Sequence, residues 1–330
     1  MLYTRLGSTG LVVSKLCLGT MTFGLQVDEA TSIRILDAAH EHGIDFLDLA
    51  DVYPLGGNLE TVGRTEEIVG RWLRGRRSDF VLATKCSGRM GPKAFHEGNS
   101  RKHIMDAVEG SLRRLGTDYI DLYQLHRYDP GTPIEETMSA LDDLVRQGKV
   151  RYVGASNFLA WQLARAQGMA AAKGVVRFAT VQPRYNLLFR EFERELFPLC
   201  ETDSIGVIPY NPLAGGMLTG KHDPSSEPTP GTRFTLGTAK GVYQHRYWHG
   251  SAFEAVADIG RVAAEAGLKT ATLALAWVLH NPVVTAPIIG ASAPEQLADT
   301  VAALDVQLEP DALALLDEIT HHFRYGDADR

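Results

Sequence analysis

The sequence predicts an α/β protein, a (β/α)₈ TIM barrel that takes up residues 1–330 as one domain. Short apolar runs alternate with longer amphipathic stretches from end to end, and this alternation occurs eight times. Repeated strand-helix units are typical of a closed parallel sheet surrounded by helices. The competing doubly wound sheet usually carries G-x-G-x-x-G after its first strand, and that motif is absent from this sequence.

The expected strands are bounded by turn residues and rich in Val, Ile, Leu or Tyr, as buried parallel strands are. They cover residues 15–18, 45–49, 80–85, 120–126, 151–156, 179–183, 206–210 and 285–290. Helix-like stretches cover residues 28–42, 65–73, 101–115, 134–147, 159–173, 193–201, 253–266, 294–304 and 311–319. We expect Ser100 to cap the helix that ends before Gly116, and Pro133 to open the next helix, which Gly148 ends.

Three further segments interrupt this rhythm. Residues 3–6 and 11–13 flank Ser8-Thr9-Gly10, which predicts a small N-terminal β-hairpin that plugs the barrel floor. Residues 87–99 and 213–250 are long connections, and loops of this length in a compact domain are usually functional. We therefore expect them to form long active-site loops.

Composition narrows the possible partners and the compartment. Hydrophobic residues make up 45% of the chain and the formal net charge is −7, so we expect a globular protein that phosphate backbones repel and no nucleic-acid partner. Cys17, Cys86 and Cys200 match neither a zinc pattern nor a C-x-x-C redox pair. With no signal peptide and no long apolar run, the sequence favours a cytoplasmic protein without a membrane partner. It carries no assembly motif.

Four ionisable residues fall at the expected C-terminal ends of adjacent strands, where barrel active sites lie. Asp48 ends the second strand, Tyr53 follows it in the loop, Lys85 ends the third strand and His126 ends the fourth. Taken singly, each has an ordinary structural role, such as a helix cap, packing, a solvated charge or a core hydrogen bond. Because three adjacent strands carry them, we expect all four side chains around one mouth of the barrel.

Together these four residue types suit the reduction of a carbonyl group. A phenol with an ordinary pKa near 10 holds its proton at pH 7 and can donate it. We expect the Lys85 ammonium to lower the pKa of Tyr53 towards the working pH, and Asp48 to keep that buried ammonium charged. His126 can donate a hydrogen bond to a carbonyl oxygen that gains negative charge.

In these four residues the sequence resembles the aldo-keto reductase superfamily, whose catalytic set is Asp, Tyr, Lys and His at these barrel positions. The stretch Asp48-Leu49-Ala50-Asp51-Val52-Tyr53 is similar to the family's D-x-A-x-x-Y, and Lys85 and His126 match its lysine and histidine strands. The likeness extends over nearly the whole chain. It is greatest to bacterial reductases related to the β subunits of voltage-gated potassium channels.

The resemblance implies a binding site for NADPH. Ser156, Asn157 and Gln182 are similar to the residues that hold the nicotinamide carboxamide, and their side chains supply the donors and acceptors that an amide needs. Tyr210 corresponds to the aromatic residue that stacks on the nicotinamide ring. Further cofactor contacts are implied for Gly19, Thr20, Met21 and Asp48.

The segment after the seventh strand is rich in glycine and ends in a lysine, so it offers backbone N–H groups and a positive charge to phosphate. It nearly matches a P-loop, but His222 stands where the magnesium-binding hydroxyl belongs, and we reject a nucleoside triphosphatase. In the resembled family this segment cradles the cofactor pyrophosphate, and Arg233 aligns with a further phosphate-binding arginine. The segment's residues are Asn211, Pro212, Leu213, Ala214, Gly215, Thr219, Gly220 and Lys221.

The segment from Gly290 to Gln296 opens a helix after the eighth strand, and a helix N-terminus there suits an anion. By resemblance, Ser292 and Gln296 contact the adenosine 2′-phosphate, and Asp299 contacts the adenine. Many members of the family place Lys or Arg near this turn, and this chain does not. The implied cofactor is therefore NADPH, with NADH possible.

The function that we expect is NADPH-dependent reduction of a small aldehyde or ketone to an alcohol, without a metal ion. Aromatic residues expected near the mouth favour apolar or aromatic substrates; they are Phe23, Tyr53, Tyr128 and Trp248. Two alternatives stay open. One is a lyase or aldolase that uses Lys85 as a Schiff-base nucleophile. The other is a non-enzymatic NADPH sensor or regulatory subunit.

Overall fold

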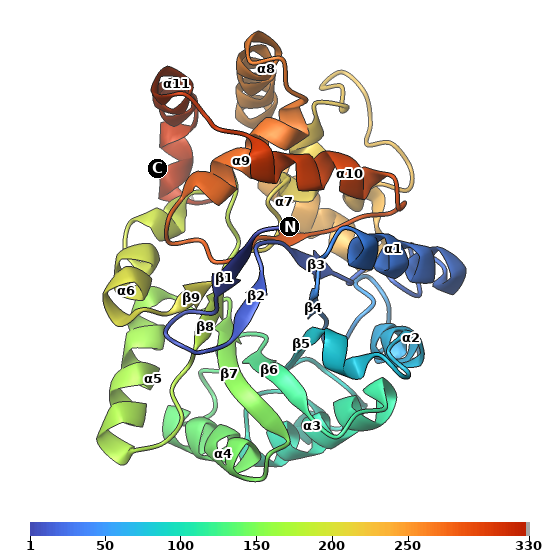
Figure 1. Cartoon of the computed structure of the whole chain (residues 1–330), viewed down its shortest axis with the longest axis vertical. Helices are drawn as coiled ribbons and strands as arrows, with labels where there is room; N and C mark the ends of the chain where they lie inside the picture. The colour runs from blue at the N-terminus through green and yellow to red at the C-terminus, as the bar shows by residue number, and fades with distance from the viewer. Residues whose placement is uncertain (328–330) are drawn as a thin grey trace.

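In the computed structural model, which describes residues 1–327, eight parallel strands form one sheet with the order β10-β3-β4-β5-β6-β7-β8-β9. Helices surround this sheet on its outer side (Figure 1). All eight expected strands are present, with the bounds β3 Cys17–Gly19, β4 Phe46–Asp48, β5 Val81–Cys86, β6 Ile120–Leu125, β7 Val150–Ser156, β8 Thr180–Gln182, β9 Gly206–Val207 and β10 Ile288–Ile289.

Hydrogen bonds across the last seam close the sheet into a barrel. The amide of Thr285 donates to the carbonyl of Val207 at 2.7 Å, and the amide of Ile288 donates to the carbonyl of Pro209 at 2.8 Å. Parallel bridges join Val207 to Val284 and Tyr210 to Ile288 along the same seam. The strands therefore form the expected (β/α)₈ barrel.

The helices follow the strands in the expected alternation. Their bounds are α1 Glu29–Glu41, α2 Arg64–Trp72, α3 Arg101–Leu115, α4 Ile134–Arg146, α5 Ala160–Lys173, α6 Leu196–Asp203, α7 Lys240–Tyr247, α8 Gly250–Glu265, α9 Thr270–His280, α10 Gln296–Val301 and α11 Pro310–Thr320. Short 3₁₀ helices are η1 Arg77–Asp79, η2 Ala94–His96, η3 Glu191–Glu193, η4 Ala214–Thr219, η5 Arg233–Thr235, η6 Gly237–Ala239, η7 Ala302–Asp305 and η8 His321–Tyr325. As expected, the Ser100 hydroxyl caps α3 by accepting from the amide of His103 at 3.3 Å.

The structure contains two helices that the sequence did not predict, α7 and α9. α9 is buried from Thr272 to Val278, so its sequence is apolar on every face and lacks the one-sided pattern that reveals a surface helix. α7 lies inside the expected loop 213–250, and its short, polar and glycine-containing sequence carries little helix signal. The long connection is therefore partly helical.

The expected N-terminal hairpin is present as β1 Tyr3–Arg5 paired antiparallel with β2 Val12–Ser14 (Figure 1). Leu6 and Val13 are fully buried and pack into the barrel interior with Phe46 and Leu122. The turn lies so close to the start of β9 that a Cβ on Gly7 would stand 2.6 Å from the amide nitrogen of Gly206. The hairpin thus closes the N-terminal end of the barrel.

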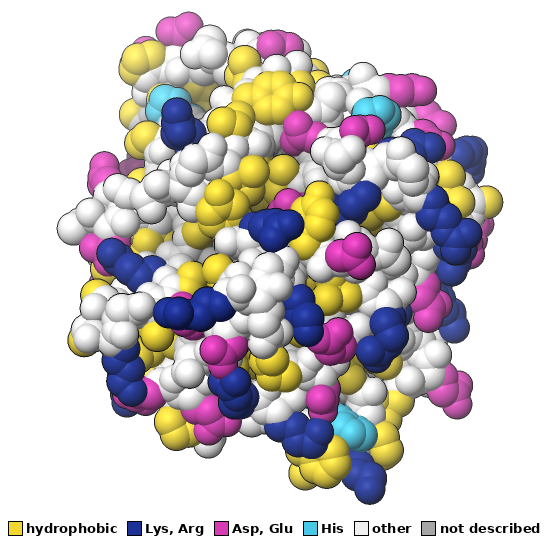
Figure 2. Space-filling model, turned by 60° about the horizontal axis from the view of Figure 1, so that its bottom comes forward, with side chains coloured by type: hydrophobic (Ala, Val, Ile, Leu, Met, Phe, Trp, Pro, Cys, Tyr) yellow, Lys and Arg dark blue, Asp and Glu magenta, His cyan; other side chains and the backbone are white. Residues whose placement is uncertain are grey.

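Basic and acidic side chains intermingle on the molecular face shown in Figure 2. Exposed ion pairs join neighbouring helices or lie within one helix, such as Arg71 with Glu29 and Lys102 with Asp106. Exposed pairs of this kind contribute about 0–1 kcal/mol each to stability. Within residues 1–327, no single helix is long and apolar enough to span a membrane, and α8 and α9 meet that test only as a pair bent by 91°.

The buried hairpin residue Leu6 should be essential for stability. We expect Leu6→Ala to lower the free energy of unfolding by about 2–5 kcal/mol, because it leaves a cavity at the barrel floor. The control is Leu2→Ala in the same hairpin, where the side chain is 56% exposed, and its effect should be within about 0.5 kcal/mol. Urea denaturation measures both. Equal effects of the two substitutions would show that the hairpin does not seal the barrel.

Candidate active site

The four residues expected at the barrel mouth lie together at the C-terminal ends of β4, β5 and β6. Side chains alternate along a strand, so the residue two places after an inward apolar residue also points inward. Asp48 follows Phe46 in this way and Lys85 follows Ala83. The Lys85 Nζ donates to Asp48 Oδ2 at 2.5 Å, to the Leu49 carbonyl at 2.7 Å and to the Tyr53 hydroxyl at 3.4 Å.

Two buried glutamine side chains hold the other oxygen of Asp48. Gln182 Nε2 donates to Asp48 Oδ1 at 2.8 Å, and Gln124 Nε2 donates to the same oxygen at 3.1 Å. Gln182 Nε2 also approaches Gln124 Oε1 at 3.3 Å. The sequence analysis missed Gln124. Its inward position, two places after buried Leu122 on β6, is the signal that would have found it.

Burial and the ion pair set the protonation states at this mouth. Burial by itself lowers the pKa of Lys85, but the Asp48 carboxylate and the Tyr53 hydroxyl outweigh it and raise that pKa above its ordinary value. For Tyr53, burial raises the pKa, and the neighbouring Lys85 ammonium lowers it only in part. The expectation of a lowered Tyr53 pKa is therefore wrong, because burial outweighs the ammonium. At neutral pH the pair is an ammonium beside a protonated phenol.

His126 follows β6 and completes the mouth. Its ring lies edge-on to the Tyr53 ring, with 5.8 Å between the ring centroids. The Asn157 side-chain amide donates to the His126 carbonyl at 2.9 Å, which holds its backbone. Burial, and then the charges of Lys85 and Arg127, lower the pKa of His126 to about 3. The imidazole is neutral at pH 7 and has one N–H to donate.

A cavity of about 1450 Å³ opens from these residues and extends along the top of the barrel. Asp48, Tyr53 and His126 line it near the ends of β4 and β6, and Gln296 on α10 lines it as well. Pockets for a single drug-sized ligand usually measure about 300–1,000 Å³. This cavity therefore has room for a dinucleotide together with a small substrate.

The residues expected at the nicotinamide also line the cavity, at the ends of β7, β8 and β9. Tyr210 donates from its hydroxyl to Asn157 Oδ1 at 2.9 Å, and Ser156 donates to the Gln182 carbonyl at 2.9 Å. Since Asp48 takes the Nε2 group of Gln182, the side-chain oxygen of Gln182 remains as an acceptor for a ligand. Gly19, Thr20 and Met21 line the wall beside them.

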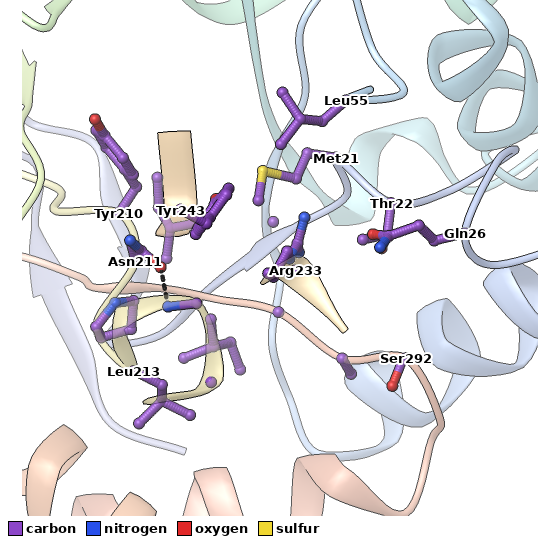
Figure 3. Close-up of a pocket in the computed structure, with 18 of the residues that line it drawn as sticks. Met21, Thr22, Gln26, Leu55, Tyr210, Asn211, Leu213, Arg233, Tyr243 and Ser292 are labelled. Carbon is purple, nitrogen blue, oxygen red and sulfur yellow. Dashed lines mark hydrogen bonds between the residues drawn. The ribbon is translucent and has the colours of Figure 1, made fainter. Parts of the chain in front are cut away.

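The glycine-rich segment after β9 forms one side of the cavity, as Figure 3 shows around Asn211 and Leu213. Gly215 and Gly216 have φ values of 69° and 101°, a left-handed conformation that glycine adopts at little cost. Asn211 Oδ1 accepts from the Gly215 amide at 2.6 Å. Pro212, Thr219 and Lys221 line the same wall, whereas Ala214 is fully buried and Gly220 lies outside the lining.

Arg233 points into the cavity between Tyr243 and Met21 (Figure 3). Within residues 1–327 its Nη1 atom is buried and has no hydrogen-bond partner, and the guanidinium lies 6.0 Å from the Tyr243 ring centroid. Burial lowers the pKa of Arg233, because a buried cation without an anion beside it is destabilised. An anionic group in the cavity would satisfy this guanidinium, so the donors present fit a phosphate.

The far end of the cavity lies where α9 meets α10. Gly290, Ser292, Gln296 and Asp299 line this part of the cavity, and Gln296 Oε1 accepts from the Ser292 amide at 2.8 Å. The sequence showed no basic residue near this turn, but the fold brings Lys269 there from the start of α9. Without a prediction of α9, no local signal placed this lysine.

The aromatic residues predicted at the mouth are largely elsewhere. Phe23 is fully buried in the core, and Trp248 packs against Phe234 and Phe253. Tyr128 packs against Phe158 and Trp161, outside the cavity lining. Of the four, only Tyr53 lines the cavity, and Tyr243 on α7 faces it in their place. Within the described residues, no group of three or more His, Cys, Asp or Glu could hold a metal ion.

Comparison with known proteins decides the family. The model described as "Aldo/keto reductase family" matches residues 15–321. The chain belongs to the aldo/keto reductase family. It is therefore an oxidoreductase that acts on carbonyl groups, in a family that generally binds NAD(P)H.

Relatives of this aldo/keto reductase include enzymes and a channel subunit. "Uncharacterized oxidoreductase YrpG" of Bacillus subtilis is 43% identical over 96% of this chain and 95% of its own length. "Probable voltage-gated potassium channel subunit beta" of Arabidopsis thaliana is 38% identical over 93% of this chain and 92% of its own. "Versiconal hemiacetal acetate reductase" of Aspergillus parasiticus is 35% identical over 96% of each chain. The branch expected from the sequence is confirmed.

The depressed pKa of His126 predicts a loss of stability in acid. Below its ordinary pKa of about 6.5, the unfolded chain binds a proton at this ring, whereas the folded chain does so only near pH 3. Stability should therefore fall as pH drops from 6.5 to 3, by up to about 1.4 kcal/mol per pH unit from this residue. Urea denaturation of wild type and His126→Gln across this window isolates the contribution. Parallel pH profiles would show that the ring titrates normally.

Proposed function

We propose that this aldo/keto reductase reduces aldehydes or ketones to alcohols with NADPH, and that Tyr53 is the proton donor. The observation that carries the proposal is the buried Lys85–Asp48 pair, whose ammonium lies 3.4 Å from the Tyr53 hydroxyl at one end of a large cavity. A phenol that keeps its proton at pH 7 and has a cation beside it is suited to general acid catalysis.

The cavity residues fit NADPH along its whole length. NADPH supplies a hydride to the carbonyl carbon. The Nη1 atom of Arg233 suits its pyrophosphate, because within residues 1–327 it is a buried donor without a hydrogen-bond partner. Lys221 in the same lining adds a positive charge. Ser156, Asn157 and Gln182 suit a carboxamide, and the Tyr210 ring suits stacking beside them.

Each residue at the mouth then has a defined task. Tyr53 transfers its hydroxyl proton to the substrate oxygen, and neutral His126 donates a hydrogen bond to that same oxygen as it gains negative charge. Lys85 stabilises the phenolate that remains on Tyr53. Asp48 keeps Lys85 charged, and the amide of Gln124 holds Asp48 in place.

The substrate end of the cavity favours apolar carbonyl compounds. Its lining beside Tyr53 and His126 includes Val52 and Leu55, with Tyr243 opposite (Figure 3). Apolar walls of this kind bind aliphatic or aromatic groups through the hydrophobic effect. We therefore propose small aldehydes and ketones with such groups as the substrates.

The two alternative functions have different degrees of support. A Schiff-base lyase needs a neutral, accessible amine, whereas Lys85 is fully buried and its ion pair with Asp48 raises its pKa. A regulatory subunit keeps some support, because one relative carries the name of a potassium channel subunit. The four polar residues gathered at the mouth favour turnover over sensing alone.

Replacing the proposed proton donor tests this function. We expect Tyr53→Phe to lower the rate of NADPH oxidation with a panel of aldehydes and ketones by about 10²–10⁴-fold, because the phenol supplies the proton. The NADPH dissociation constant, measured by fluorescence, should stay within about twofold, since Phe keeps the ring. Tyr128→Phe is the matched control, because that ring lies outside the cavity.

Two outcomes would contradict the proposal. Full activity in Tyr53→Phe would mean that another group donates the proton. Tight NADPH binding by wild type, without oxidation by any carbonyl of the panel, would favour the sensor.

A further inference from the structure

The part of the cavity lining beside α10 contains an ion pair that joins this helix to the start of α9. Lys269 stands directly before α9, and its Nζ donates to both carboxylate oxygens of Asp299 on α10, at 2.8 Å and 2.7 Å. Both residues line the cavity. The other basic residues in the described lining come from other segments; they are Arg89, Lys221, Arg233 and Arg246.

Uncharged donors lie on the same side of α10. Gln296 precedes Asp299 by three residues, so their side chains lie on one face of the helix. Gln296 Oε1 accepts from both the amide and the hydroxyl of Ser292, at 2.8 Å and 3.3 Å. An ammonium, a hydroxyl and a carboxamide thus adjoin one another at this end, and phosphate oxygens accept from all three.

The ion pair is weak enough for a ligand to open it. The Lys269 and Asp299 side chains are 70% and 54% exposed, and exposed pairs usually contribute little to stability. A phosphate monoester carries a charge of about −1.5 to −2 at pH 7, which is more than the single charge of a carboxylate. A phosphate can therefore take the lysine from Asp299, while the freed carboxylate repels it.

We propose that the Lys269–Asp299 pair sets the preference of the cavity between NADPH and NADH. Lys269 leaves Asp299 to bind the phosphate on the adenosine ribose, and Asp299 opposes that phosphate while it accepts from ribose hydroxyls when no phosphate is present. Carboxylates commonly hold such hydroxyls in dinucleotide sites. This inference rests on the proposed function, because it assumes that the adenosine lies at this end.

The two residues should therefore act with opposite signs on the phosphate. We expect Lys269→Gln to weaken binding of 2′,5′-ADP about tenfold, the loss typical of one charged hydrogen bond, with 5′-AMP affinity within about twofold. Asp299→Asn should strengthen 2′,5′-ADP binding and weaken 5′-AMP binding, because it removes both the repulsion and the acceptor. Calorimetry of each fragment measures these effects without turnover.

Controls separate a local effect from a general one. Lys102→Gln removes a lysine from another exposed ion pair, with Asp106 on α3, and neither residue lines the cavity. It should leave the affinity for both fragments unchanged. Raising the salt concentration should reduce the preference of wild type for 2′,5′-ADP, since exposed charges are screened. Thermal melting checks that each variant is folded.

The possible failures are distinguishable. Equal losses for both fragments in Lys269→Gln, or no loss for either, would overturn the role of the pair while leaving NADPH as cofactor. Weaker 2′,5′-ADP binding by Asp299→Asn would also overturn it. If wild type binds none of the four ligands, which are the two fragments, NADPH and NADH, the proposed cofactor is wrong. The inference about the ion pair is then wrong as well, because it depends on that cofactor.

Discussion

The buried ion pair between Lys85 and Asp48 is the constraint on which the rest of the site depends. Removing two charges from water costs several kcal/mol per ion, and only close contact with further hydrogen bonds offsets that cost. The barrel supplies those bonds from Leu49, directly after β4, and from two further strands, through Gln124 on β6 and Gln182 on β8. The pair in turn keeps an ammonium beside Tyr53, which is what makes that phenol useful in acid catalysis.

The barrel interior is divided into an apolar floor and a polar top. Leu6 of the hairpin packs with Phe46 and Leu122 below, and the inward residues two places further along the strands are Asp48 and Gln124. The apolar floor keeps water from reaching the ion pair from below, so its electrostatic interactions stay strong. On both strands, therefore, the residue that packs in the apolar core and the residue that serves the active site lie two positions apart.

Much of this arrangement was predictable, because strands and their ends are local features. The eight strands, the hairpin and the positions of Lys85 and His126 follow from short apolar runs and their ends. The prediction failed where burial removes periodicity, as in α9, and where a loop forms a short helix, as in α7. It also failed for the pKa of Tyr53, because the extent of burial is not visible in one segment.

By itself, the sequence determined the barrel, the order of its strands and the residues at the strand ends. These features follow from local sequence patterns, because side chains alternate along each strand and parallel strands all end at the same side of the sheet. Only the tertiary structure decided that Gln124 holds Asp48, that among residues 1–327 the buried Nη1 atom of Arg233 has no hydrogen-bond partner, and that Lys269 meets Asp299 in the cavity wall. Each of these features brings together residues that are far apart in the chain, or depends on how deeply a group is buried. Such properties arise from packing, which no single stretch of sequence contains.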